Sequence, residues 1–335
     1  MKKIYLLLLL FLTVFLLPAG ETYSFYLLSD MHLGAPETYN PKRFRGDIHR
    51  AQKALPAYEK MFAHMMKEGK DAKFVIQLGD MVEGNTKGEK EHTRQLTEAI
   101  AFLKKNFQIP VYHVMGNHDP YGPGGVAASK AVLLPEIAGQ LKKKDLTAAN
   151  YSFYQGDDLF IVTEYSKKAK GQEFITRTLK SLKKKPRYIF IATHIPFITL
   201  TDTAFADFLA QYNAVVLSGH IHRNYLLQYT KNNKTMTQIT VCSWLPGKNG
   251  DKQRARQTST DPNVFKEYIR SQAVKFKQPA FMAVYEKLWE PYLSFTQYAG
   301  NGYTKITVSD KGLLLLRQGS DITRKPVVTT ITINK

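Results

Sequence analysis

The chain has 335 residues, 44% of them hydrophobic, so it is long enough to bury a large core. Cys242 is the only cysteine, which excludes an intramolecular disulfide. The formal net charge of +19 favours anionic partners, such as an anionic surface or polymer. No aromatic residues interleave with the lysine runs at 142–144 and 183–185, so the sequence carries no specific nucleic-acid signature.

Residues 1–20 have the composition of an export signal. Lys2 and Lys3 precede an apolar stretch at 4–17, and small residues follow it. Because this stretch is shorter than the roughly 20 residues of a spanning helix, we expect a signal peptide and a mature chain that begins near residue 21, exported to the periplasm or the exterior. An uncleaved membrane anchor is the alternative, because Leu17 and Pro18 are poor residues before a cleavage site.

The chain up to residue 222 alternates short apolar runs with amphipathic stretches. The apolar runs predict strands at 23–28, 74–78, 111–114, 160–162, 188–192 and 214–217. The amphipathic stretches predict helices at 48–66, 91–103, 172–182 and 202–212. This alternation is typical of a layered α/β fold with parallel strand pairs.

After residue 222 the pattern changes to one strand after another. Strands are expected at 225–229, 237–241, 281–285, 293–297, 313–317 and 327–333. A polar segment at 247–278 interrupts them, and we expect an exposed insertion with a helix at 264–275. These strands are expected to belong to the same single domain, over residues 21–335, as the preceding elements.

Polar side chains follow five of the predicted strands directly. They are Asp30 and His32, then Asp80, then Asn117 and His118, then His194, and finally His220 and His222. Because sites in α/β sheets form beyond the carboxyl ends of the strands, we expect these side chains to converge. Carboxylate oxygens and imidazole nitrogens suit hard or borderline divalent cations. The sequence therefore predicts a site for two metal ions.

The ordered motifs Asp-x-His, Gly-Asp, Gly-Asn-His-Asp, His and Gly-His-x-His, taken together, resemble those of the calcineurin-like metallophosphoesterase superfamily over residues 23–222. The resemblance implies a four-layer αββα sandwich, in which two mixed β-sheets are flanked by helices. The strands of 223–335 would then complete the second sheet. It also implies two divalent metal ions, for which Mn, Fe and Zn are all suitable with mixed oxygen and nitrogen ligands.

By analogy with the family, one ion would be held by Asp30, His32, Asp80 and His222. Asp80 would bridge to the second ion, and Asn117, His194 and His220 would complete that site. The implied reaction is hydrolysis of a phosphomonoester or phosphodiester by a hydroxide that bridges the two metals.

His118 would stabilise the phosphoryl group or protonate the departing oxygen, and Asn117 would also contact the substrate. A carboxylate beside the other nitrogen of His118 would set its tautomer, and Asp119 and Glu83 are the candidates. Glu83 stands where purple acid phosphatases carry a tyrosine ligand, so their tyrosinate chemistry is not expected. The remaining histidines are expected to be surface or packed residues: His49, His64, His92 and His113.

Two functions of different class remain open. The first is an exported metal-dependent phosphoesterase, and the second is a catalytically silent binding or scaffold protein that kept the fold. All seven expected ligands and His118 are present, which favours the enzyme. The choice of phosphoester substrate is expected to depend on the loops at 34–45, 120–125 and 247–278.

Overall fold

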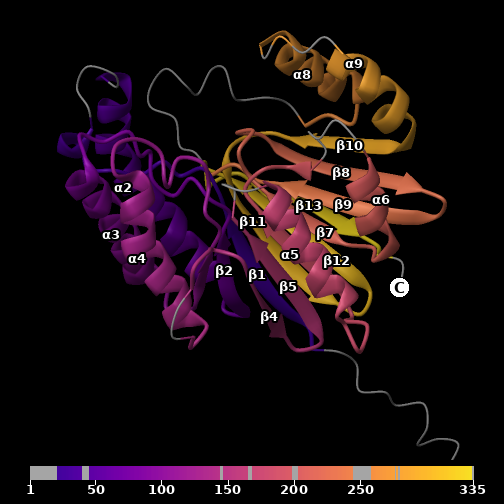
Figure 1. Ribbon diagram of the computed structural model, residues 1–335, viewed down its shortest axis with the longest axis horizontal. Helices are drawn as coiled ribbons and strands as arrows, with labels where there is room; N and C mark the ends of the chain where they lie inside the picture. Colours follow the sequence, from indigo (N-terminus) through magenta and orange to yellow (C-terminus); the bar gives the residue numbers. More distant parts are fainter. Residues whose placement is uncertain are drawn as a thin grey trace, which may run out of the picture.

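Two β-sheets pack face to face in the computed structural model of the protein, and helices cover the outer face of each sheet (Figure 1). The structure describes residues 21–39, 45–143, 146–164, 168–197, 203–243, 258–275, 277 and 280–333. The predicted four-layer αββα sandwich is therefore confirmed. The expected signal segment at 1–20 lies outside the described residues, as does the 247–257 part of the expected insertion.

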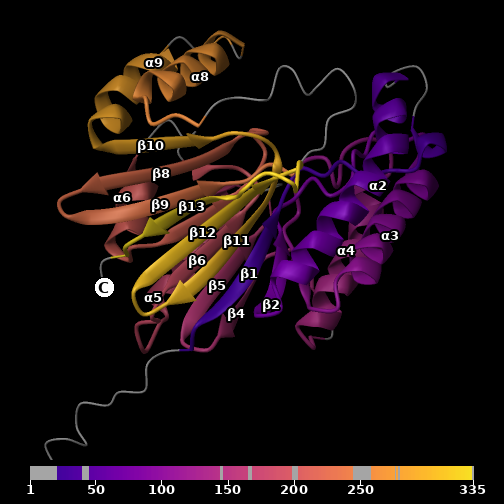
Figure 2. The ribbon, with the colours of Figure 1, turned by 180° about the vertical axis from the view of Figure 1, so that it is seen from behind.

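The first sheet has six strands in the order β13-β12-β11-β1-β2-β3. Their bounds are β1 Tyr23–Leu28, β2 Ala72–Gln77, β3 Val111–His113, β11 Gly302–Ser309, β12 Gly312–Gly319 and β13 Val327–Ile331. The strands β1, β2 and β3 are parallel, whereas β11 to β13 form an antiparallel run beside β1. Segments from the two ends of the chain thus lie side by side in one sheet (Figure 2).

The second sheet has seven strands in the order β10-β8-β9-β7-β6-β5-β4. Their bounds are β4 Tyr151–Gln155, β5 Asp158–Thr163, β6 Ile189–Thr193, β7 Val215–Ser218, β8 Asn224–Lys231, β9 Lys234–Thr240 and β10 Leu293–Tyr298. The strands β5, β6, β7 and β9 are parallel. Both sheets are mixed, as predicted. The strands after residue 222 do not all complete the second sheet, as was expected: β8, β9 and β10 lie in it, whereas β11, β12 and β13 belong to the first sheet beside β1.

Helices cover the two outer faces. The first sheet is covered by α2 Arg45–Glu68, α3 Glu89–Asn106 and α4 Gly125–Gln140, and the second by α5 Lys168–Lys180 and α6 Ala204–Gln211. The helices α8 Pro262–Lys275 and α9 Ala280–Val284 lie beside β10 (Figure 1). Among the described residues, no helix combines the length and the apolar character that crossing a membrane requires.

Aromatic side chains hold the two sheets together. The ring of Phe25 on β1 meets the rings of Phe160 on β5 and Phe190 on β6 edge to face, at centroid distances of 5.4 and 5.5 Å. All three side chains are fully buried. Such pairs add about 0.5–1.5 kcal/mol each beyond the burial of their area. They therefore help to fix the position of one sheet relative to the other.

Individual elements also differ from the sequence prediction. The segment 281–285, expected as a strand, is the helix α9 followed by a π-helical turn at Tyr285–Trp289, because a short apolar run does not distinguish a strand from a packed helix. The helix α4 was not expected, since Gly125 and Pro135 are typical helix breakers. The strand β11 was not expected either, because Thr304 is buried beside Tyr303 and hides the alternating pattern.

Candidate metal centre

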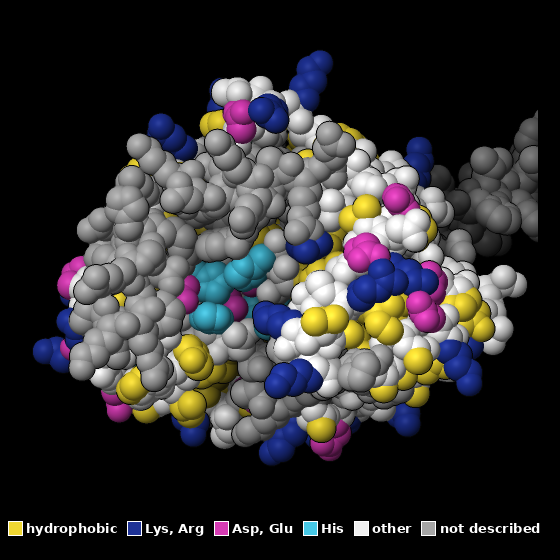
Figure 3. All heavy atoms as spheres, turned by 90° about the horizontal axis from the view of Figure 1, so that it is seen from above, with side chains coloured by type: hydrophobic (Ala, Val, Ile, Leu, Met, Phe, Trp, Pro, Cys, Tyr) yellow, Lys and Arg dark blue, Asp and Glu magenta, His cyan; other side chains and the backbone are white. Residues whose placement is uncertain are grey.

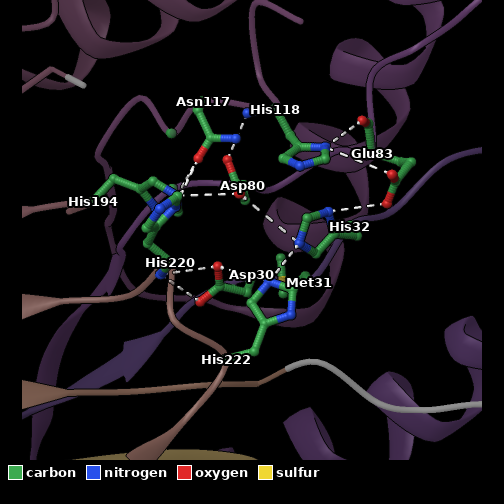
Figure 4. Close-up of polar contacts among 12 residues, drawn as sticks. Asp30, Met31, His32, Asp80, Glu83, Asn117, His118, His194, His220 and His222 are labelled. Atoms are coloured by element: carbon green, nitrogen blue, oxygen red, sulfur yellow. Dashed lines mark hydrogen bonds and ion pairs between the residues drawn. The ribbon is translucent and has the colours of Figure 1, made fainter. Parts of the chain in front are cut away.

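The predicted ligand side chains meet at one rim of the sandwich. They follow the carboxyl ends of β1, β2, β3, β6 and β7, which are parallel strands within each sheet. The structure brings together all seven predicted residues, which point toward a common centre (Figure 4): Asp30, His32, Asp80, Asn117, His194, His220 and His222. Histidine and acidic side chains are visible in a hollow of the surface at this rim (Figure 3).

The first group of donors consists of Asp30, His32 and His222. The Nε2 atoms of His32 and His222 lie 3.2 Å apart. His222 Nε2 is also 3.4 Å from Asp30 Oδ1. On the other side, His32 Nε2 is 3.9 Å from Oδ2 of Asp80, which belongs to the second group.

The second group consists of Asp80, His194 and His220. Asn117 Oδ1 lies 3.0 Å from His194 Nε2 and 2.9 Å from His220 Nδ1. His194 Nε2 is 3.1 Å from Asp80 Oδ2, the same oxygen that faces His32 in the first group. Asp80 therefore lies between the two groups.

Acceptors outside the centre orient two of these rings. His194 Nδ1 is 2.8 Å from the carbonyl oxygen of Leu78, which can only accept, so this nitrogen carries the proton. His32 Nδ1 is likewise 3.0 Å from a carboxylate oxygen of Glu83. The Nε2 atoms of both rings thus face inward, as in metal-binding histidines held by an outer acceptor. Nitrogen and carboxylate donors that converge in a buried space fit a shared cation.

Burial and mutual charge shift the pKa values of these groups. Burial opposes charge on Asp80, but His194 and His32 hold the pKa of its carboxyl group well below the usual range. Burial also opposes charge on His194, yet the Asp80 carboxylate outweighs it and raises the pKa of His194 to about 9. Burial and the charge of His194 lower the pKa of His220 to about 4. Neighbouring groups of this centre therefore differ in their pKa: that of Asp80 is lowered, that of His194 is raised, and that of His220 is lowered.

The backbone at the ligands is unusual. Asp30, His32, Asp80, His220 and His222 all have positive φ, between 49° and 70°. Only a few per cent of non-glycine residues adopt this left-handed conformation, and strained conformations of this kind cluster at functional sites. At each of these turns the side chain points from the end of its strand toward the common centre.

Close backbone approach explains two glycines in the motifs. A Cβ atom on Gly116 would overlap the backbone nitrogen and Oδ1 of Asp80. A Cβ atom on Gly219 would overlap Ser29 Oγ and crowd Asp30 Oδ2. The loops also bind one another directly, because the backbone N–H of His220 donates to both carboxylate oxygens of Asp30 at 3.0 and 3.1 Å. These contacts fix the loops of the two sheets against each other.

The structure places the Asp119 carboxylate under the loops and not beside the His118 ring. It accepts hydrogen bonds from four backbone N–H groups, those of Asp80, Met81, Val82 and Gly116. Burial and the nearby Asp80 carboxylate raise the pKa of Asp119 to about 6, while the N–H donors of Gly116 and Val82 act in the opposite direction. Asp119 is therefore a positioning residue for the two loops.

Glu83 is the acidic residue beside His118. His118 Nδ1 donates to the backbone oxygen of Glu83 at 2.8 Å, and a carboxylate oxygen of Glu83 lies 3.6 Å away. The other carboxylate oxygen contacts His32 Nδ1. Glu83 thus fixes the orientation of both rings (Figure 4). Between the two candidates from the sequence, the geometry favours Glu83.

One supporting histidine was not assigned to the site from the sequence. His92 on α3 is fully buried, and its Nε2 is 2.5 Å from the backbone oxygen of Asp119. It was expected only as a surface or packed residue. Neither its spacing nor its neighbours in the chain indicate this contact, because the contact depends on how α3 packs behind the loop that follows β3.

Comparison with known proteins gives a family and a fold. The family model described as calcineurin-like phosphoesterase matches residues 23–224. No curated protein matches the chain by sequence.

Several solved structures have the same fold at low sequence identity. GAP50, described as the anchor in the inner membrane complex of Plasmodium, has a TM-score of 0.53 and 14% identity, over 94% of this chain and 90% of its own. A dimetal phosphatase from Danio rerio has a TM-score of 0.51 and 14% identity, over 93% and 99%. The purple acid phosphatase PPD1 from yellow lupin has a TM-score of 0.52 and 12% identity, over 93% and 54%. Because the family model covers more than half of the sequence, the chain belongs to the calcineurin-like phosphoesterase family.

Proposed function

We propose that the protein is an exported phosphoesterase that depends on two divalent metal ions and hydrolyses phosphomonoesters or phosphodiesters. One observation carries the proposal: the inward-facing nitrogens of His32 and His194 lie on either side of a single carboxylate oxygen of Asp80, at 3.9 and 3.1 Å. A shared carboxylate between two sets of imidazole donors is the arrangement that two adjacent cations require. The family match and the likeness to the dimetal phosphatase support the same chemistry.

The donor groups suggest how the ions would be held. Asp30, His32, His222 and Asp80 would hold one ion, and Asp80, Asn117, His194 and His220 the other. When bound, such cations neutralise phosphoryl oxygens and lower the pKa of a water molecule in the site. Manganese, iron and zinc all accept this mixture of oxygen and nitrogen ligands.

His118 would handle the proton of the departing group. Its Nδ1–H is committed to the backbone oxygen of Glu83, so Nε2 is the nitrogen that can give a proton to a leaving oxygen. The Glu83 carboxylate, 3.6 Å from Nδ1, would help to hold the ring in this orientation. The side-chain amide of Asn117 and the imidazole of His118 would both contact phosphoryl oxygens.

Metal content and turnover test this function together. The protein, reconstituted separately with manganese, iron and zinc, should hydrolyse 4-nitrophenyl phosphate or bis(4-nitrophenyl) phosphate. Asp80→Ala should remove more than one metal equivalent by elemental analysis, because the bridging carboxylate reduces repulsion between both cations, whereas His222→Ala should mainly weaken one site. Asp157→Ala is the control, since the Asp157 side chain is exposed and forms a surface ion pair with Lys184 at 3.6 Å.

Two results would contradict the proposal. Equal metal content in wild type and Asp80→Ala would refute the bridging role. A fully metal-loaded protein without activity on any phosphoester would favour the silent scaffold instead, a role for which the described anchor GAP50 offers a structural parallel.

Export has its own test. The basic head and short apolar middle of residues 1–17 motivate it. Mass spectrometry of the protein from its native compartment should find a chain that lacks Met1 to Leu17. An intact N-terminus would refute cleavage and favour the membrane anchor.

A further inference from the structure

A small cavity opens directly beside the metal centre. It has a volume of about 200 Å³, and the ring of His222 forms part of its wall. The other described lining residues are Ile221, Arg223, Asn224, Gln297, Tyr298, Gly300 and Asn301. This volume is below the range of about 300–1,000 Å³ that holds a whole ligand. The cavity is therefore large enough for one chemical group of a substrate, if the phosphate to be cleaved binds at the neighbouring metal centre.

The cavity wall carries a positive charge that no acidic residue in the described part of the chain neutralises. Arg223 is the only lysine, arginine or acidic residue among the described lining residues. Its guanidinium lies 4.5 Å over the ring of Tyr268 on α8, and its Nη1 donates to Tyr225 Oη at 2.8 Å. No described carboxylate forms an ion pair with it. These contacts hold the Arg223 guanidinium in place, and its positive charge can still interact with an anion in the cavity.

A second arginine lies behind the same wall. Arg317 on β12 is only 7% exposed, and its guanidinium stacks 4.4 Å over the ring of Tyr298, which lines the cavity. Its hydrogen-bond acceptors are all neutral: the side-chain oxygen of Asn224 and the backbone oxygens of Tyr225 and Thr240. Its Nε is buried without a hydrogen-bond partner. Burial lowers the pKa of Arg317 to about 10, so the group is still charged at neutral pH.

A buried cation without a counter-ion is unfavourable, and an anion placed nearby offsets that cost. Arg317 reaches the cavity wall through Tyr298 and Asn224, while Arg223 borders the space itself. Basic side chains are also visible along one side of the hollow that holds the histidines (Figure 3). Both arginines thus favour negative charge next to His222.

We propose that this cavity is a subsite for a second anionic group of the substrate, a phosphate or a carboxylate, carried a few bonds away from the scissile phosphate. The inference rests on the proposed phosphoesterase function and narrows it to substrates with two anionic groups. The position of α8 matters for this specificity, because Tyr268 on that helix holds Arg223 against the cavity.

Paired esters test the subsite by turnover. The substrates are alkyl phosphates with two to four carbon atoms that end in a hydroxyl, a carboxylate or a second phosphate, used with the metal-loaded full chain. The kcat/KM for the best ester with two anionic groups should exceed that for the hydroxyl ester of the same length by about 10- to 100-fold, the range of hydrogen bonds to charged groups. The carboxylate and phosphate series show which anion the subsite prefers.

Arginine variants assign the preference to this cavity. Arg223→Gln should reduce the ratio to below about threefold, and Arg223→Lys should restore part of it because the charge remains without the planar fork. Arg177→Gln is the matched control, because Arg177 stacks on Phe174 of α5, away from the cavity, and should keep the wild-type ratio. A ratio near one in the wild type at every length overturns the proposal. So does an equal loss in the Arg177 and Arg223 variants.

Binding separates this inference from the proposed function. Propane-1,3-bisphosphonate and propylphosphonate are not hydrolysed, and calorimetry on the metal-loaded protein should show at least tenfold tighter binding of the bisphosphonate, lost in Arg223→Gln. If this difference appears but no ester is hydrolysed, the subsite stands and the enzymatic function fails. If esters are hydrolysed and neither turnover nor binding discriminates, the subsite fails alone.

Discussion

The carboxylate of Asp119 accepts a hydrogen bond from the backbone N–H of Asp80 at 3.1 Å. The same carboxylate accepts from Gly116 at 2.7 Å, so one buried acidic group joins the loop after β2 to the loop after β3. In the reverse direction, Asp80 Oδ1 accepts from the backbone N–H of His118 at 2.7 Å. The proposed bridging ligand is therefore held at both its backbone and its side chain by the segment 116–119.

Replacing Asp119 with asparagine should weaken both the fold and the centre. The amide NH₂ would face backbone N–H donors, leaving one or more of them unsatisfied at a cost of about 1–3 kcal/mol in the free energy of unfolding. Metal content should fall as well, because Asp80 loses its support. Denaturation in chelator and elemental analysis measure the two effects. The control is Asp157→Asn, an exposed carboxylate, and an unchanged metal content in Asp119→Asn would contradict the positioning role.

Gly116→Ala should abolish stable metal binding. The added Cβ would overlap the backbone nitrogen and side-chain oxygen of Asp80, which are pinned and cannot move aside. Gly139→Ala is the matched control, because a Cβ there meets nothing within 4 Å. Since Gly139 lies within α4, its replacement should raise the free energy of unfolding by up to about 1 kcal/mol. Equal metal content in the two variants would show that the loops have room to separate.

His118→Asn should separate a proton donor from a ligand. If His118 protonates the leaving oxygen, the variant should keep its metal content but lose about 10²- to 10⁴-fold in turnover of an alkyl phosphoester. Nitrophenyl esters depart readily as anions, so the loss on them should be much smaller. Steady-state kinetics over leaving groups of increasing basicity gives the measurement. A uniform loss on all of them would leave His118 with phosphoryl binding only, and loss of metal would make it a ligand.

His113 should make the fold sensitive to acid independently of the metal centre. The side chain is only 1% exposed, and burial lowers its pKa from 6.5 to about 4, with smaller effects of Glu136, which raises it, and of Lys104, which lowers it. Below pH 6.5 the unfolded chain binds a proton at this position that the folded chain does not. The free energy of unfolding should therefore fall between about pH 6.5 and pH 4, by up to about 3 kcal/mol.

His113→Gln isolates that contribution. The glutamine does not titrate, so the stability of this variant should change less over the same pH interval than that of the wild type. Denaturant unfolding at several pH values in the presence of a chelator measures both curves. Parallel curves would mean that His113 does not contribute to the acid sensitivity.

The position of the centre could be predicted from the sequence because the relevant signals are local. Strand-forming runs end just before Asp30, Asp80 and His194. Because sites form at the carboxyl ends of parallel strands, these residues are predicted to lie in one site. The roles of Asp119 and His92 could not be predicted in this way. Both depend on backbone groups of loops that come together only in the folded chain.

The fold prediction failed where local pattern and tertiary packing disagree. β11 is a central strand that pairs with both β1 and β12, so a threonine is buried at Thr304 in line with Ile306 and Val308, and the alternation of burial is not matched by an alternation of apolar residues. The helix α4 forms in spite of Pro135 because it packs against α3. In both cases long-range contacts outweigh intrinsic propensity.

The left-handed backbone at Asp30, His32, Asp80, His220 and His222 restricts which amino acids can serve as donors here. Aspartate, asparagine, histidine and glycine adopt positive φ with comparative ease, whereas β-branched and bulky side chains do so at a cost. A donor exchange that is meant to change the metal preference, for example to glutamate or cysteine, is therefore unfavourable for the backbone conformation, whatever its effect on coordination. Variation in this centre should be easier at Asn117 and His194, whose φ values are not positive.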